Sequence, residues 1–476
     1  MGNEKIKISQ QDNFKGNFGL VLRSSAIFYA ICNQSVKTTI SFLNYWKLKR
    51  NLDVKVVVSC RKMNGQLLER FYPEFCGGMV VNITPDYEDF EGSIEVEVFS
   101  LENLVIPYAA IMATYETPES ISMVHSYTRN YSPYEIEEGR TISKGRESCW
   151  TVHAKDKLSS FCVMHNGSVE QPAQSALINL KNHNNENFSF QFDIPVLKPY
   201  ETLRLNIDDI VTDLEQLSGG RPLNASINFE LAHGFTRLLV GNENIESGEL
   251  QVTHSNFNYS EHQTDNCSEE SKTAYMHLIK PNGQLADVIV YPDMQKGDYV
   301  LKDDTIETDF YSGQRLYYKP IASTLEFNSK NATLPTRIVT AITGGQEGKL
   351  PYECSLGVIH NERPKKRLYW GVASASNAIK GKLYIAAIEE VYGVCEQNII
   401  IRLYSAVSHE YLELTIPPCE IPSFLEGVEF DEMFENACLF LGEELGYYTV
   451  FSEYGGLFVY SSLQNENGSL TIEHGF

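Results

Sequence analysis

Apolar and polar residues alternate one by one along many short stretches of the chain. The alternation is clear in residues 52–56, 94–98, 188–194 and 470–472. It places apolar side chains on one face of a β-strand and polar side chains on the other. Asn-Gly pairs that begin at Asn64, Asn166, Asn282 and Asn467 supply the residues that tight turns between strands require. The pattern predicts antiparallel strands along most of the chain.

Helical spacing of apolar residues is rare. Ile207, Val211 and Leu214 belong to one such stretch, which stops at Gly219-Gly220 and predicts a helix over 207–217, with a counterpart at 430–435. The strands follow one another too closely for parallel units, whose crossovers need about a dozen residues. We therefore predict a mostly β fold of tandem antiparallel β-sandwich or jelly-roll-like units with few short helices.

Similar segments recur along the chain at rising offsets. The offsets are 206 (353 − 147), 209 (412 − 203), 212 (436 − 224) and 220 (474 − 254), as one alignment with small loop insertions would give. We predict a tail over 1–13 and a first unit over 14–262, with two β halves at about 14–135 and 136–262. A second unit over 263–476 is expected to be its duplicate, with a shortened first half.

Composition limits the classes of partner. The 476 residues carry a formal net charge of −23, which disfavours nucleic acid because binding to phosphates needs Lys and Arg. The start of the chain is polar and no apolar run is long enough to span a bilayer, so neither a signal peptide nor a membrane segment is expected. The ten cysteines form no CxxC pair and no Cys/His zinc spacing, so we expect no metal and no cofactor, with free thiols in the cytoplasm or another reducing compartment.

Three strands end in a comparable histidine. His125, His254 and His474 each stand four residues after an aliphatic residue. An imidazole in such a position can act as a ligand, an acid or a base, or it can bond a neighbouring turn and be copied with the repeat. Repetition alone does not decide between these two roles.

A second group of reactive residue types lies between 147 and 167. Together with His125, the candidates for acid or base chemistry are Glu147 and His165. In the proposed alignment Ala373 replaces His165 in the second unit, so such chemistry is expected in the first unit only.

The segment 127–140 has no apolar periodicity and concentrates Arg, Tyr and Glu. Arg129, Tyr131 and Tyr134 from this segment, with Trp150 and His153 from the next strand, are the predicted ligand-binding residues. Aromatic rings beside planar polar groups suit a glycan at the junction of the two halves. The alternative is a domain seam where these groups satisfy one another.

Three classes of function remain open. A binding or assembly protein acting on a glycan or a protein partner is the preferred prediction, with the oligomeric state left open. The alternative is a carbohydrate-active or isomerase-type enzyme with a His/Glu site in unit one. The third is a capsid-like or shell-like double jelly roll, and fold alone does not choose among them.

Overall fold

The computed structural model describes most of the chain from Leu22 to Gly475. The ranges are 22–75, 77–102, 111–130, 143–154, 157–231, 234–235, 237–257, 273–291, 297–311, 313–330, 334, 338–357, 359–360 and 366–475.

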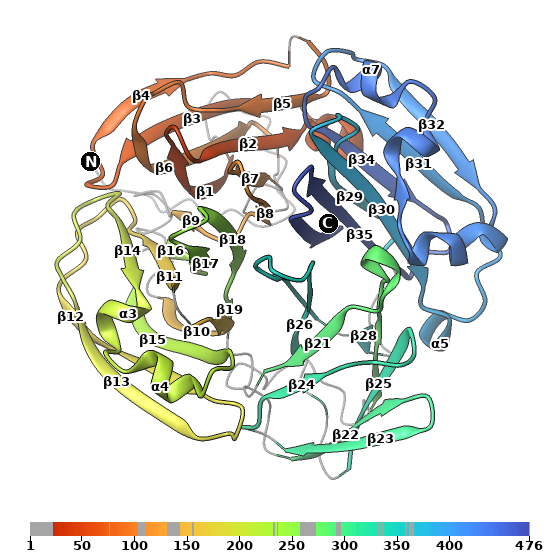
Figure 1. Ribbon diagram of the computed structural model, residues 1–476. Helices are drawn as coiled ribbons and strands as arrows, with labels where there is room; N and C mark the ends of the chain where they lie inside the picture. The colour runs from red at the N-terminus through yellow and green to blue at the C-terminus, as the bar shows by residue number, and fades with distance from the viewer. Residues whose placement is uncertain are drawn as a thin grey trace, which may run out of the picture.

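These residues form four β-sandwiches, named A to D in chain order (Figure 1). Sandwich A holds β1 (Leu22–Cys32), β2 (Lys37–Leu43), β3 (Lys55–Lys62), β4 (Leu67–Phe71), β5 (Val80–Ile83), β6 (Phe90–Ser100), β7 (Met112–Glu116) and β8 (Ile121–His125). Sandwich B holds β10 (Ser143–Val152), β11 (Leu158–His165), β12 (Gln174–Lys181), β13 (Asn187–Ile194), β14 (Thr202–Asn206), β15 (Leu223–Leu231), β17 (Leu239–Asn244) and β18 (Glu249–His254). Sandwich C holds β20 (Thr273–His277), β21 (Asp287–Val290), β22 (Asp298–Asp303), β23 (Ile306–Tyr311), β24 (Leu316–Tyr318), β25 (Thr324–Ser329), β26 (Val339–Gly344) and β27 (Tyr352–Gly357). Sandwich D holds β29 (Leu368–Ala373), β30 (Ile379–Ala387), β31 (Ile399–Tyr404), β32 (Tyr411–Ile416), β33 (Val428–Glu429), β34 (Gly446–Phe451), β35 (Leu457–Asn465) and β36 (Leu470–His474).

All four sandwiches share one strand order. Numbered within each sandwich, the strands pair in the orders 4-3-6-1 and 5-2-7-8, and these pairings are all antiparallel. In sandwiches B, C and D the two orders are separate sheets, whereas in sandwich A the pairing of β1 with β2 joins them into one 8-stranded sheet. Two-residue strands supplement them: β9 (Arg129–Asn130) pairs with β16 (Gly234–Phe235), β19 (Asn256–Phe257) with β10, and β28 (Ile359–His360) with β20. The predicted fold of repeated antiparallel β-sandwich units is confirmed, whereas the narrower jelly-roll description stays a prediction.

The four sandwiches are arranged as a ring around a central axis (Figure 1). The last strand of each sandwich lies innermost: β8 contacts β18 and β36, and β27 contacts the same two strands. Sandwiches A and D, the first and last in the chain, close the ring. The rings of Tyr45 and Trp370 stack there at 4.9 Å, and the Tyr447 hydroxyl donates to the Ser41 carbonyl at 2.6 Å.

The helices are short and lie outside the sheets. They are α1 (Tyr45–Arg50), α3 (Ile207–Ile210), α4 (Leu214–Ser218), α5 (Glu389–Tyr392), α6 (Phe430–Met433) and α7 (Ala437–Leu441), with 3-10 turns η2 (Pro281–Gly283) and η3 (Pro418–Leu425). The predicted single helix over 207–217 is wrong, because Val211 is extended (φ −123°, ψ 99°) and separates α3 from α4. No helix in the described ranges is long and apolar enough to cross a membrane.

The repeat predicted from the sequence is only partly aligned with these strands. His254 and His474 end β18 and β36, which occupy the same place in sandwiches B and D. The pairing of Asn224 with Asn436 is wrong, because Asn224 lies in β15 whereas Asn436 caps α7. Likewise Glu147 lies in a first strand and Glu353 in a last strand. The division of the chain into 14–262 and 263–476 stays a prediction.

Candidate functional site

Histidines from three sandwiches meet at the axis of the ring. The ring centroid of His125 lies 4.3 Å from that of His254 and 5.1 Å from that of His474. The three residues are the final residues of β8, β18 and β36, so the same strand position in three repeats brings them together. The sequence singled out these histidines, and the structure adds their convergence.

Glu473 joins this histidine cluster as its carboxylate. Its Oε2 lies 3.2 Å from His125 Nδ1 and its Oε1 lies 3.7 Å from His474 Nε2. The Cys354 thiol on β27 donates to Glu473 Oε1 across 3.8 Å. Burial raises the pKa of Glu473, lowers that of His474 to about 3 and lowers that of His254 well below its usual value. Glu473 precedes His474 in the sequence, but its contacts with His125 and Cys354 join strands far apart in the chain, so the sequence did not indicate that these residues meet.

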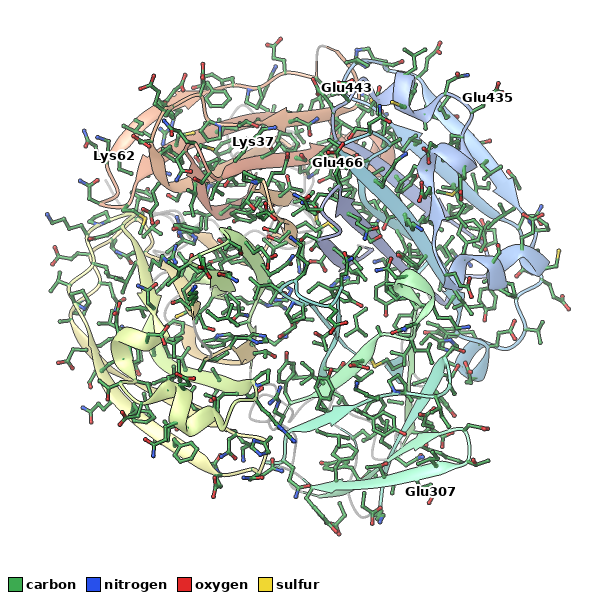
Figure 2. All side chains as sticks on the ribbon, in the orientation of Figure 1. Lys37, Lys62, Glu307, Glu435, Glu443 and Glu466 are labelled. Atoms are coloured by element: carbon green, nitrogen blue, oxygen red, sulfur yellow. The ribbon has the colours of Figure 1, made fainter. Side chains whose placement is uncertain are left out.

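Polar side chains continue along the axis and link the innermost strands. Gln251 Nε2 donates to the Ile121 carbonyl and to Ser469 Oγ, both at 3.1 Å, which joins sandwiches A, B and D. Ser120 Oγ accepts from the Leu250 N–H at 2.8 Å. Side chains fill the centre of the ring, as Figure 2 shows, so the axis is a packed polar core.

His165 lies in the seam between sandwiches A and B. Its Nε2 is 3.0 Å from the Tyr127 hydroxyl and its Nδ1 is 2.9 Å from Thr202 Oγ1, while burial lowers its pKa to about 3. Both ring nitrogens are therefore occupied by structural partners. Ala373, its supposed replacement, lies on β29, which corresponds to β10 and not to β11.

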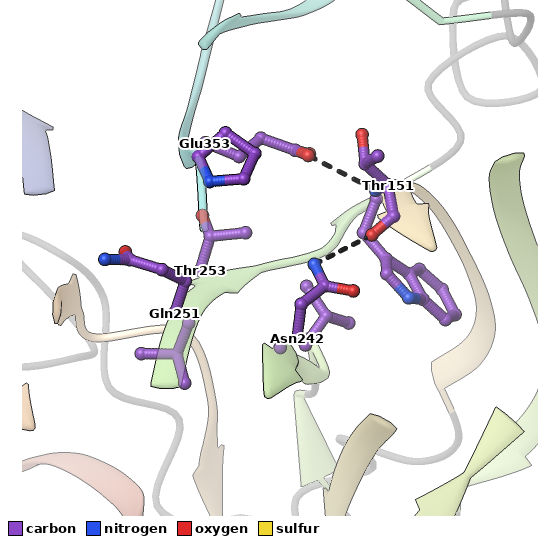
Figure 3. Close-up of a pocket in the computed structure, with 10 residues that line it drawn as sticks. Thr151, Asn242, Gln251, Thr253 and Glu353 are labelled. Carbon is purple, nitrogen blue, oxygen red and sulfur yellow. Dashed lines mark hydrogen bonds between the residues drawn. The ribbon is translucent and has the colours of Figure 1, made fainter. Parts of the chain in front are cut away.

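Trp150 and Thr151 face a small cavity between sandwiches B and C (Figure 3). Its volume is about 10 Å³, which is the space of one water molecule and too little for a sugar. The Thr151 N–H donates to Glu353 at 3.2 Å, and Asn242 Nδ2 donates to the Thr151 carbonyl at 3.0 Å. The Trp150 side chain is 1% exposed, so it belongs to the core of sandwich B.

The other predicted ligand-binding residues do not form a described surface site. Arg129 is buried, with its backbone in the β9–β16 pair. His153 is half-buried, and burial together with the nearby Arg315 charge lowers its pKa to about 4. Tyr131 and Tyr134 lie outside the described residues, and of Glu147 only the backbone is described, so the glycan site stays a prediction.

A larger cavity of about 180 Å³ lies between sandwiches A and D. The turn between β7 and β8 and the turn between β35 and β36 form its walls, with Glu116 and Glu466 among the lining residues. Pockets for drug-sized ligands measure roughly 300–1,000 Å³, so this space suits at most a very small molecule.

Comparison with known proteins gives no family. No protein-family model matches the chain, and no curated protein matches it. Among solved structures, a tetra-tandem repeat in the extending region of a large adhesion protein matches at 8% identity and a TM-score of 0.10, covering 95% of this chain and 98% of that one. Two B repeat units of the collagen-binding protein of Staphylococcus aureus match at 9% identity and a TM-score of 0.12, covering 95% and 99%. At these TM-scores the likeness carries no argument about function.

Proposed function

We propose that the protein is a binding or assembly protein that takes an extended segment of a protein partner on the open edge of β13. The supporting observation is that β13 ends its sheet on the circumference of the ring (Figure 1). An edge strand offers unpaired backbone groups to which a further strand can add.

β13 lacks the features that usually protect an edge strand. Its eight residues, NFSFQFDI, contain no Lys, no Pro and a single charged residue, Asp193, and they pair with β12 without a bulge. The corresponding strand β4 carries Glu69 and Arg70 beside a bulge, and β32 carries Glu413 in an ion pair with Arg402. Charges and bulges discourage strand addition. The one charged residue of β13, Asp193, stands next to the end of the strand, whereas Glu413 lies in the middle of β32 and Glu69 and Arg70 lie beside the bulge of β4.

The side chains of β13 define the partner that would fit. Phe188, Phe190 and Phe192 lie on the inner face and are only half-buried, while the residues between them are exposed. A strand added at this edge would cover the phenylalanine rings with apolar residues at alternate positions. The net charge of −23 favours Lys or Arg in the intervening positions of the partner.

The other classes of function have less support. A His165-based enzyme would need a ring nitrogen that can reach a substrate, and both nitrogens of His165 are engaged. A sugar would have to reach Arg129 and Trp150, whose side chains are buried. A shell made of copies of this chain would use the same edge pairing, with a second β13 as the added strand.

Selection from a displayed library of random 12-residue peptides would test the proposal. We expect enrichment of peptides with alternating apolar residues and intervening Lys or Arg. A selected peptide should protect β13 amides from hydrogen exchange. The double variant S189K/Q191K should weaken its binding at least tenfold, about 1.4 kcal/mol, because both positions are exposed and would repel a basic strand.

The double variant Y411K/T415K is the matched control, since both residues are exposed on the corresponding edge strand β32. It should bind the peptide as the wild type does. Absence of enriched peptides, or equal binding by both double variants, would contradict the proposal. Binding on a glycan array without peptide binding would support the glycan alternative instead, and a concentration-dependent dimer abolished by S189K/Q191K would support self-assembly.

A further inference from the structure

The histidine cluster at the axis has a composition that proteins use to bind transition metals. Two imidazoles and one carboxylate, from His125, His474 and Glu473, place their ligand atoms within 4.8 Å of one another. In a tetrahedral zinc site with bonds of about 2.0–2.1 Å, neighbouring ligand atoms lie roughly 3.3 Å apart. The separation of 3.2 Å between His125 Nδ1 and Glu473 Oε2 matches this value, and His474 Nε2 lies 3.7 Å from the other carboxylate oxygen, Oε1.

His254 supplies a third imidazole beside these groups. Its Nδ1 donates to the Ser255 carbonyl at 2.7 Å, so Nε2 carries the lone pair of the neutral ring. This Nε2 is buried and makes no hydrogen bond within the described part of the chain, and the ring stands edge-on to His125. The His254 side chain is 1% exposed. A buried acceptor that has no hydrogen-bond donor lowers the stability of the fold unless a ligand binds to it.

The surroundings of the rings resemble the outer shell of a metal site. Metal-binding histidines usually donate the second ring nitrogen to a carbonyl or carboxylate, which fixes the tautomer. His254 does so towards Ser255, and His474 Nδ1 lies 3.4 Å from the Gly475 carbonyl.

Nearby charged side chains and the exposure of the cluster to solvent also affect the binding of a cation at this site. Arg237 lies near His254 and Lys366 near His474, and their positive charges oppose a cation. Glu473 is the carboxylate within the cluster, and the Cys354 thiol holds one of its oxygens. The His474 side chain is 28% exposed, which gives an ion a path from solvent.

We propose that His125, His474 and Glu473 form a Zn²⁺ site in which His254 Nε2, whose ring lies 4.3 Å from that of His125, moves in as the fourth ligand, so that the ion ties together the innermost strands of sandwiches A, B and D. Four protein ligands of nitrogen and oxygen type complete a tetrahedral shell and leave no open position, which is typical of a structural zinc site. The inference is independent of the proposed partner site on β13. The absence of a zinc spacing in the sequence does not oppose it, because the ligands come from three strands far apart in the chain.

Zinc titration of the chelator-treated full chain tests the site. We expect about one Zn²⁺ per chain by mass spectrometry of the metal, together with a rise in melting temperature on adding Zn²⁺ that chelation reverses. With Co²⁺ in place of Zn²⁺, a visible absorption band of tetrahedral intensity should appear. H474A should weaken Zn²⁺ binding at least tenfold, since it removes one ligand from the exposed side.

H183A is the matched control, because His183 is an exposed histidine on sandwich B away from the axis. It should bind Zn²⁺ as the wild type does. If H474A does not fold, E473Q keeps the shape of the side chain while removing its charge, and it should weaken binding in the same direction. Wild-type protein without stoichiometric Zn²⁺ binding, or equal affinity in wild type, H474A and E473Q, would overturn the proposal.

Discussion

The imidazole of His165 connects two sandwiches through a short hydrogen-bonded chain. The Tyr29 N–H donates to the Tyr127 hydroxyl oxygen at 2.8 Å, which leaves the hydroxyl hydrogen for His165 Nε2. His165 Nδ1 then donates to Thr202 Oγ1. This arrangement needs the neutral ring, because a second ring proton would confront the Tyr127 hydroxyl.

Protonation of His165 should therefore destabilise the fold. Its folded pKa of about 3 lies below the unfolded value of about 6.5, so the unfolded state binds more protons between these values. The stabilising contribution is complete above about pH 6.5 and is lost as the pH falls towards 3, by up to about 1.4 kcal/mol per pH unit. Urea midpoints of wild type and H165Q between pH 7 and pH 4.5 should show a shallower pH dependence in H165Q.

H183Q, a change at an exposed histidine, should keep the wild-type pH dependence. Parallel curves for wild type and H165Q would show that His165 does not titrate as we expect.

The α3–α4 segment shows how an element can depart from its sequence pattern. The apolar spacing that predicts one helix is real, because Ile207, Val211 and Leu214 are all buried in the core of sandwich B. The segment does not form one continuous helix. Two short helices, separated by the extended residue Val211, direct these side chains into the core. Burial of the apolar side chains thus outweighs helix continuity here.

Val211→Asp should unfold sandwich B at lower denaturant concentration. The side chain at 211 is 1% exposed, and a carboxylate there would have no water and no partner, which costs several kcal/mol, on the order of 3. The adjacent T212D is the control, because Thr212 is exposed and should shift the urea midpoint little. Equal midpoints for V211D and wild type would contradict the assigned core.

The strands were predictable from sequence to a greater extent than their assembly. Period-two alternation identifies β13, in which exposed and half-buried positions alternate, and it also identifies β36, although both faces of that strand are buried. The equivalence of His254 and His474 followed from local spacing, but Asn224 and Asn436 were paired wrongly because a two-residue match carries no strand position. Register within a sheet depends on partners far along the chain, which a single sequence does not specify.

At the scale of the molecule, closure of the ring brings the site together. The innermost strands contact one another mainly through side chains, as Gln251 does with Ile121 and Ser469. At one end of the axis the turns before these strands meet: Asn467 donates to the Pro118 carbonyl at 2.7 Å, and Lys349 lies between Glu119 and Glu249. Contacts between the first and last sandwiches have no local signature, so the convergence of the histidines could not be predicted.

Zero-length carbodiimide cross-linking of Lys349 tests this closure most directly. Lys349 of sandwich C lies 3.1 Å from Glu119 of sandwich A and 3.0 Å from Glu249 of sandwich B, whereas Lys380 and Asp431, at 2.8 Å within sandwich D, provide the internal control. The ring predicts cross-linked peptides that join Lys349 to Glu119, in addition to the Lys380–Asp431 product. Detection of the Lys380–Asp431 product while Lys349 links only to residues of its own sandwich would contradict the ring.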